Sequence, residues 1–218
     1  MGCLKVTVAD VVPAEQVRDG LLSTEQGRGA FVRPKPHVRL LVTGASFRKH
    51  RALGLPGFNA QALEQGQRPE QRIRSVATVS APPEVAMRLS LDESSPVVVR
   101  RRVFLLEGQP VALCDSYYPA EWASKRDADR AARADPRWCN ALIEDPEGPI
   151  RRQIARSIDD LIARMPTHEE TVELGLPPGV PVVRVLRTVF DSADLPVEVQ
   201  DSVMAADRHE FRYKEQMR

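Results

Sequence analysis

The chain has 218 residues, enough for one sizeable domain or for one domain with a small appendage. Its 31 lysine and arginine residues nearly balance its 30 aspartate and glutamate residues, so net charge alone indicates no class of partner. The 3 cysteines form no CxxC or Cys/His cluster, which argues against a disulfide framework and a zinc site. No apolar run approaches the roughly 20 residues that cross a bilayer, and the N-terminus lacks the layout of a signal peptide. We therefore expect a cytoplasmic protein with no membrane partner, no metal and no other cofactor.

The first predicted element is a β-hairpin near the N-terminus. Residues 21–24 and 30–32 read as its strands, and the turn between them contains Gly27 and Gly29. Glycine adopts positive φ without steric cost, so this turn can be tight. Arg28 would project from the tip, where a guanidinium can enter the negative potential of a DNA minor groove. An ordinary hairpin with a solvated arginine is the alternative.

A stretch without acidic residues follows the hairpin. No aspartate or glutamate occurs between Glu25 and Glu64, while arginine, lysine and histidine recur. Such a stretch raises the local positive potential and suits a phosphate backbone, although a solvated linker fits equally well. We assign residues 35–56 to a basic linker.

An internal repeat organises the rest of the chain. Its two copies agree in the order and spacing of apolar, proline and charged residues, so chance is a poor explanation. Arg102 falls on Arg187, and Asp115 falls on Asp201. We predict a structural role for the two aspartates at equivalent strand ends. The two copies are residues 81–115 and 166–201.

Each copy predicts one short helix followed by a strand, a reverse turn and a second strand. Two such units can pair into one antiparallel sheet with helices on one side, which is an α+β fold. A further strand is predicted at 72–79, before the first copy. The predicted helices are 83–89 and 167–174, and the other predicted strands are 97–106, 111–118, 182–190 and 197–204.

Segment 152–165 gives two conflicting signals. Its apolar residues recur with a helical period, whereas the repeat places it in the position of strand 72–79. We favour a strand.

The N-terminal sequence resembles winged-helix repressors of the GntR family. "VRDGLLSTEQGRGAFVRP" resembles the end of the recognition helix and the wing, and "KVTVADVVPAEQVRDG" resembles the recognition helix. The family's two preceding helices have no counterpart in the chain, and Pro13 interrupts the helix that remains. We therefore expect a partial winged helix over residues 1–34. The DNA-binding residues that the resemblance implies are Thr7, Gly27, Arg28 and Gly29.

Residues 57–218 resemble the UTRA effector-binding domain of the HutC subfamily of GntR regulators. The matching segments occur in order and with the expected spacing. The resemblance implies a chorismate-lyase-like fold that senses a small molecule, and a homodimer that represses transcription by binding DNA. The matching segments are "GFNAQALEQGQRPEQRI", "EVAMRLSLDESSPVVVRRRVFLLEGQPVALCDSYYP", "ARMPTHEETVELGLPPGVPVVRVLRT" and "LPVEVQDSVMAADRHEFRY".

The resemblance also implies an effector site. In relatives that sense sugar phosphates, an R-x-R pair on the first hairpin holds the anion, because a guanidinium matches phosphate or carboxylate geometry. Arg102 keeps the first position of this pair, and Phe104 replaces the second. We expect an effector less polar than a sugar phosphate that still carries one anionic group. The alternative is that Phe104 belongs to the core. At two further effector-contact positions of the family, Asn59 and Glu198 keep polar groups. At two others, Cys114 stands in place of a glutamate and Met204 in place of a tyrosine.

Two alternatives to a repressor remain. The chain could be a stand-alone effector-binding module that dimerises without specific DNA binding. It could also be a chorismate-lyase-like enzyme, but the sequence contains no GxSxG, HExxH or P-loop motif. Among its histidines, only His209 is expected at a strand end that a ligand could reach. We therefore expect no catalytic residues and no enzymatic activity.

Overall fold

The computed structural model describes residues 22–25, 29–32, 39–43, 57–122, 143–147 and 150–213. Thr7, Gly27 and Arg28, three of the predicted DNA-binding residues, lie outside these ranges. Their role, and the domain boundaries at 34 and 56, stay predictions.

The predicted N-terminal hairpin is confirmed. Strand β1 (Leu22–Glu25) pairs antiparallel with β2 (Gly29–Val32), and Gly29 lies opposite Glu25 at the turn end of the ladder. Gly29 is therefore the first paired residue of the returning strand.

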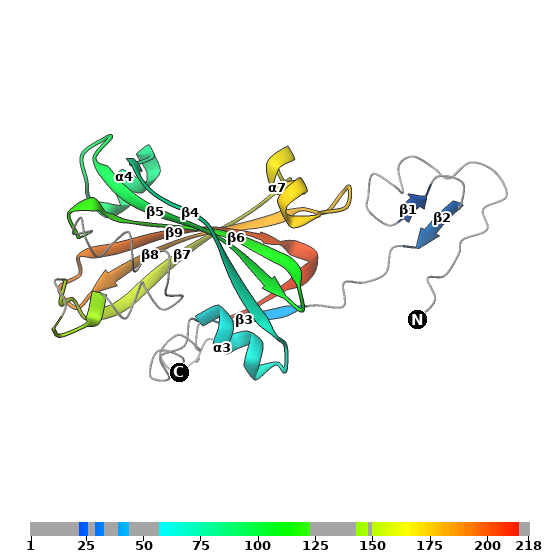
Figure 1. The fold of residues 1–218 in the computed structure, drawn as a ribbon, viewed down its shortest axis with the longest axis horizontal. Coiled ribbons are helices and arrows are strands. Elements are labelled where there is room, and N and C mark those ends of the chain that lie inside the picture. Colours follow the sequence, from blue (N-terminus) through cyan, green and yellow to red (C-terminus); the bar gives the residue numbers. More distant parts are fainter. Residues whose placement is uncertain are drawn as a thin grey trace.

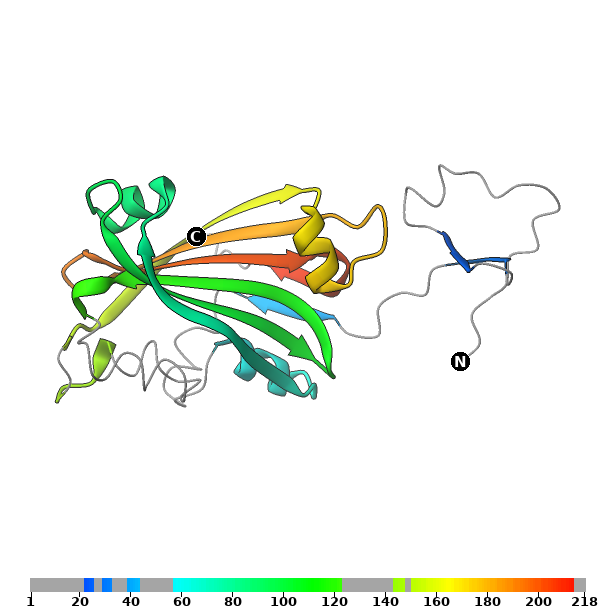
Figure 2. The same ribbon diagram turned by 45° about the horizontal axis from the view of Figure 1, so that its top comes forward.

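The main sheet has 6 antiparallel strands in the order β4-β5-β6-β9-β8-β7 (Figures 1 and 2). The first repeat contributes β5 and β6, the second contributes β8 and β9, and the two repeats meet where β6 pairs with β9. The predicted antiparallel sheet is thus confirmed. The strands are β4 (Pro69–Ser80), β5 (Pro96–Leu106), β6 (Gln109–Pro119), β7 (Ile154–Arg164), β8 (Val182–Asp191) and β9 (Pro196–Ala205).

Segment 152–165 forms β7, as the repeat predicted against the helical period. The strand pairs with β8 from Arg156 to Arg164 without interruption. A partner strand far along the chain therefore decides its conformation, because tertiary pairing overrides a local period.

Two short helices cover one face of the sheet, as predicted (Figures 1 and 2). Helix α4 (Pro83–Leu89) begins with proline, whose fixed φ and missing N–H suit a first turn. Helix α7 (His168–Leu174) begins at a capping box in which Thr167 and Glu170 satisfy each other's backbone N–H groups. Gly175 caps its C-terminal end with a φ of 55°, a left-handed backbone conformation that glycine adopts without steric cost.

The two faces of the sheet carry different side chains because neighbouring residues of a strand alternate. On β5, Val97 and Val99 pack with α4, and we call this side the helix face. Arg100, Arg102 and Phe104 point the other way. We call that side the α3 face, because Phe104 packs there with residues of helix α3 (Gly57–Glu64). Helix α3 was not predicted.

The predicted basic linker contains a strand that the sequence analysis did not place. Strand β3 (Leu40–Thr43) pairs in parallel with β10 (His209–Arg212). On its other side, the Gln65 amide accepts a hydrogen bond from Leu41 N (3.0 Å) and donates one to Leu41 O (3.2 Å). The Leu40 side chain is only 2% exposed and packs into the apolar cluster of the α3 face. The segment is thus joined to the effector-binding domain by backbone pairing and by a buried leucine.

No helix among the described residues is long and apolar enough to span a membrane. Within the same part of the chain, no group of three or more acidic, cysteine or histidine side chains could hold a metal ion.

Candidate effector site

The α3 face of β5 buries two arginines. Arg100 is fully buried and Arg102 is only 6% exposed. A buried guanidinium requires hydrogen-bond partners, because transfer of an unpaired charge from water is costly. Arg102 Nη2 donates to Ser116 Oγ (2.6 Å) and to Cys114 Sγ (3.0 Å) on the neighbouring strand. Its guanidinium carbon also lies 5.1 Å from the centre of the Phe104 ring, within cation–π range.

Cross-strand pairing continues this polar region across the centre of the sheet. Arg102 lies opposite Cys114, which lies opposite Ser202. In the adjacent row, Arg100 lies opposite Ser116, Ser116 opposite Gln200, and Gln200 opposite Arg187. The Gln200 amide donates to Ser202 Oγ (3.0 Å) and so joins the two rows. The two rows form one continuous polar region on the α3 face.

Arg187 limits this region toward the edge of the sheet. Its guanidinium donates two hydrogen bonds of 2.6 Å to the carboxylate of Asp159 on β7. Burial alone would lower the pKa of Arg187, but the hydrogen bonds and charge of Asp159 outweigh this effect and raise it. Arg187 is therefore a fixed positive charge.

Glu198 lies on the same face, one residue pair beyond the arginine rows. It is buried, and Tyr118 Oη donates to its Oε1 over 2.8 Å. Tyr118 belongs to an apolar cluster with Val98 and Val189. The predicted site residues Glu198 and Arg102 thus have separate hydrogen-bond partners.

Three predicted residues share one apolar cluster beside Arg102. Phe104 and Cys114 are buried in it, and Met204 is partly buried against it. The Phe104 ring lies 4.6 Å from the ring of Phe58 on α3. Burial raises the pKa of the Cys114 thiol, which therefore stays neutral at physiological pH. Within this cluster, Arg102 contacts the apolar ring of Phe104 and donates a hydrogen bond to the neutral thiol of Cys114.

Asn59 follows Phe58 on α3. Its side-chain oxygen accepts a hydrogen bond from Gln71 Nε2 over 2.8 Å, which ties α3 to β4. The structure therefore brings Arg102, Phe104, Cys114 and Met204 together, with Asn59 next to a residue of their cluster.

Four polar residues of the region were not predicted as site residues, although two sequence signals point to them. The repeat places Arg187 on Arg102. Strand alternation places Arg100 on the face of Arg102, and Ser116 on the face of Cys114. Gln200 lies two residues from Glu198 on β9 and follows from the same alternation.

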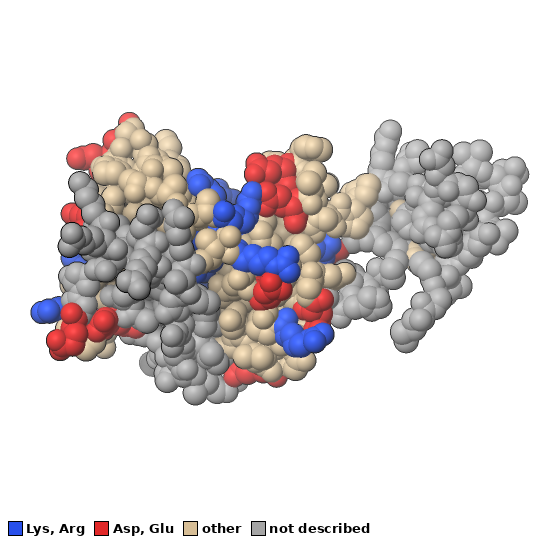
Figure 3. All heavy atoms as spheres, viewed as in Figure 1, with Lys and Arg blue, Asp and Glu red and all other residues tan. Residues whose placement is uncertain are grey.

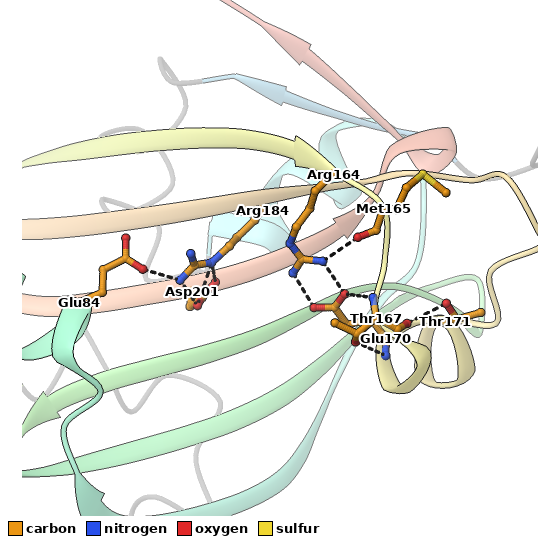
Figure 4. A network of polar contacts seen from close by, with 8 residues as sticks. All are labelled: Glu84, Arg164, Met165, Thr167, Glu170, Thr171, Arg184 and Asp201. Carbon is orange, nitrogen blue, oxygen red and sulfur yellow. Dashed lines mark hydrogen bonds and ion pairs between the residues drawn. The ribbon is translucent and has the colours of Figure 1, made fainter.

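The opposite, helix face carries ion pairs in place of a buried polar region. Figure 3 shows basic and acidic side chains over the sheet between α4 and α7. Arg184 binds Asp201 through two nitrogens, at 2.9 and 2.7 Å, and reaches Glu84 of α4 at 2.9 Å (Figure 4). Arg101 lies 3.3 Å from Asp115. The predicted position of Asp115 and Asp201 at strand ends is wrong, because both lie in the middle of their strands.

His209 does not offer a ligand contact at the surface, and that prediction is wrong. Its side chain is buried, and Nδ1 lies 2.9 Å from the carbonyl oxygen of Ala205. Burial lowers its pKa to about 4, so the ring is neutral at physiological pH.

The fold is similar to that of solved bacterial transcription regulators. The crystal structure of PhnF from Mycobacterium smegmatis superimposes with a TM-score of 0.66 and 21% identity, covering 94% of this chain and 82% of that one. The ligand-binding domain of a putative GntR-family regulator from Bordetella bronchiseptica gives a TM-score of 0.57 with 25% identity. It covers 68% of this chain and 90% of that domain. The class defined by this fold is a regulator with a ligand-binding domain.

The family follows from the sequence comparisons. The UTRA domain model matches residues 64–210, and the chain belongs to the UTRA domain family as a HutC/UTRA-type GntR regulator. The HTH-type transcriptional repressor NagR of Bacillus subtilis is 26% identical over 210 residues, which cover 96% of this chain and 79% of NagR. The HTH-type transcriptional regulator GgaR of Escherichia coli K12 is 24% identical over 155 residues, which cover 71% of this chain and 58% of GgaR. Both relatives are HTH-type transcriptional regulators.

Proposed function

We propose that this regulator binds its effector on the α3 face and that Arg102 is the main polar contact. The observation that carries the proposal is a buried guanidinium hydrogen-bonded to the hydroxyl of Ser116 and the neutral thiol of Cys114. An anionic ligand group would add a charge-assisted hydrogen bond, about twice as strong as a neutral one.

The neighbouring side chains support an effector with an apolar part. Phe104 takes the place of a second arginine, and its ring contacts Phe58 at the side of Arg102. We therefore propose one carboxylate or phosphate group on an apolar body. A sugar phosphate lacks such a body and would leave its hydroxyl groups against these rings.

A thermal-shift screen tests this proposal. The panel contains carboxylates and phosphates with aliphatic or aromatic bodies, each beside its neutral amide or alcohol. We expect hits among the anions only, and loss of at least 30-fold in affinity for Arg102→Ala. Arg101→Ala is the matched control, since Arg101 is the next residue and lies on the helix face. Loss of the ligand by Arg101→Ala with retention by Arg102→Ala would reject the site.

We also propose that residues 1–34 supply the DNA contacts and that the protein acts as a homodimer. Dimeric regulators read two half-sites related by two-fold symmetry. Arg28 in the hairpin turn is the proposed phosphate or minor-groove contact. Fluorescence anisotropy with unrelated duplexes should show weaker binding by Arg28→Ala for all sequences, with a salt slope reduced by about 1. Absence of binding by the unaltered protein at low salt would favour the stand-alone effector module.

A further inference from the structure

Strand β7 is an edge strand whose two faces are both open to solvent. It has 11 residues, and every residue from 155 to 163 is exposed. These include Ile158 and Ile162 on the helix face, 46% and 50% exposed, and Leu161 on the α3 face. Figures 1 and 2 show the strand at one margin of the sheet, opposite β4. A long edge strand with exposed apolar side chains is a template for pairing with another chain.

The opposite edge of the same sheet is protected in the ways that monomeric edges usually are. Strand β4 has a register shift between Ile73 and Ser75, and it begins with a proline. Its most exposed positions include Glu70, Arg72 and Arg74. Irregular pairing, proline and charge all oppose the addition of a further strand. Strand β7 also carries charges and has a register shift, between Ile154 and Arg156, but it contains no proline and pairs regularly from Arg156 to Arg164. Among the described residues, exposed large apolar side chains lie on β7 and none lie on β4, so the two edges differ in their capacity to pair.

The charge pattern of β7 selects a second copy of the same strand as the partner. If two β7 strands run antiparallel about a two-fold axis at Ile158, then Ile158 faces its own copy and Arg156 faces Asp160 of the second copy. The symmetry repeats this opposite-charge pair on the other side of the axis. Cross-strand pairs of opposite charge and of β-branched residues both stabilise a sheet.

Two other registers, with the two-fold axis at Asp160 or at Ile162 on the same face of β7, are less favourable. An axis at Asp160 would place Asp160 against its own copy and Arg156 against Arg164, which are like-charge pairs. An axis at Ile162 also pairs opposite charges, Asp160 with Arg164, but the two strands overlap only over residues 160–164. Arg164 is moreover held by two hydrogen bonds to Glu170, at 2.7 and 2.6 Å.

Arg156 and Asp160 can take a second partner. Arg156 pairs with Asp194 and stacks on the Phe190 ring at 3.8 Å, yet its side chain is 43% exposed. Asp160 lies 2.7 Å from Arg88 of α4 and is 50% exposed. Both side chains are thus oriented by neighbours and still face solvent.

We propose that two copies of the protein associate through β7, pairing antiparallel about an axis at Ile158 and joining two 6-stranded sheets into one continuous sheet. The proposal rests on the homodimer proposed above and names its contact surface. It buries Ile158, Ile162 and Leu161 at the junction and satisfies the outward backbone groups of β7.

Cysteine cross-linking tests the axis directly. In a Cys3→Ser, Cys139→Ser background, the buried Cys114 is kept and Ile158→Cys is introduced. Directly opposed residues have Cβ atoms about 4.5–5.5 Å apart, close to disulfide range. We expect the Ile158→Cys variant to form a covalent dimer under mild oxidation that a reductant reverses. Asp160→Cys and Ile162→Cys are matched controls, because their copies would lie roughly 13 Å and 26 Å apart at about 3.3 Å per residue.

The outcomes separate the surface from the homodimer itself. If the unaltered protein is a monomer by light scattering at tens of micromolar, both proposals are overturned. If it is a dimer and Ile158→Cys gives no covalent product, only the β7 surface is overturned. If Ile162→Cys cross-links in its place, the axis at Ile158 is rejected.

A charge exchange gives an independent readout in the otherwise unaltered chain. Arg156→Asp and Asp160→Arg should each raise the dissociation constant of the dimer at least tenfold, because each creates two like-charge pairs. The double variant should recover most of the loss, since the exchange restores opposite charges. Circular dichroism checks that each variant is folded. No recovery in the double variant would mean that the two residues act only on Asp194 and Arg88, which would reject the pairing.

Discussion

Asp115 and Asp201 lie directly opposite each other where β6 pairs with β9. They are also equivalent residues of the two repeats, so the internal two-fold axis of the sheet passes between them. The polar region on the other face follows the same symmetry. The axis relates the pair Cys114–Ser202 to the pair Ser116–Gln200, because Ser116 and Ser202 are equivalent residues of the two repeats. A duplicated helix–strand–strand unit therefore places two carboxylates side by side, and each has its own arginine.

This arrangement predicts the effect of replacing Asp115. Burial raises the pKa of Asp115, the Arg101 charge opposes that rise, and Asp201 adds to it. A carboxyl whose folded pKa is raised contributes less to stability once pH passes its unfolded pKa of about 3.9, because ionisation is then favoured in the unfolded chain. Asp115→Asn should therefore raise the melting temperature relative to the unaltered protein more at pH 7 than at pH 4. Glu121→Gln removes an exposed acid shortly after the same strand and controls for the general effect of losing one carboxyl group.

His209 predicts acid sensitivity. Burial lowers its pKa to about 4, whereas a histidine in the unfolded chain titrates near 6.5. Its contribution to stability is complete above pH 6.5 and is lost as pH falls toward 4, because the unfolded chain then binds the proton more readily. The shift corresponds to about 3 kcal/mol at 1.36 kcal/mol per pKa unit. Urea unfolding from pH 7 to pH 4 should show this loss, and it should be absent in His209→Gln.

The exposed His168 at the start of α7 provides the control for that measurement. His168→Gln should keep the acid-dependent loss of stability. If His168→Gln and His209→Gln change the pH profile equally, the assignment to His209 is wrong.

Local sequence was sufficient for some elements and not for others. The helix predicted at 83–89 is observed with the same bounds, and its proline start and its buried residues lie within that one short segment. Strand β7 required the repeat, since its local period favours a helix. Strand β3 was missed because its four residues pair with β10, far along the chain, and only that pairing distinguishes them from a linker.

The site shows the same limit. Arg102, Phe104, Cys114 and Met204 were placed by resemblance, and the structure brings these four residues together. The hydrogen bond between Tyr118 and Glu198 joins residues 80 positions apart and depends on the β6–β9 pairing. Register of this kind is set by three-dimensional packing, so sequence alone did not predict that Glu198 and Arg102 have separate partners.

Gln65 is predicted to hold β3 against the effector-binding domain. Its side-chain amide forms hydrogen bonds with both the backbone N–H and the carbonyl of Leu41, and each bond contributes about 1 kcal/mol to stability. Gln65→Ala should increase hydrogen exchange in residues 39–43 by roughly tenfold while leaving β5 and β6 unchanged. Gln65→Glu should give an intermediate increase, because it keeps the acceptor for Leu41 N and loses the donor to Leu41 O. Equal exchange in both variants and the unaltered protein would show that β10 alone holds the strand.

Phe104 is predicted to set the preference against phosphorylated ligands. Phe104→Arg restores the R-x-R pair of sugar-phosphate sensors beside Arg102. A second guanidinium at this buried position lacks a partner in the free protein, so the variant should be less stable by a few kcal/mol. Inorganic phosphate or a sugar phosphate should then raise its melting temperature more than that of the unaltered protein, because ligand binding stabilises the folded state. Phe104→Leu controls for loss of the ring and should show lower stability without the phosphate response. A phosphate response equal in all three proteins would mean that position 104 does not face the ligand, and that Phe104 serves the core with Phe58 and Leu106 alone.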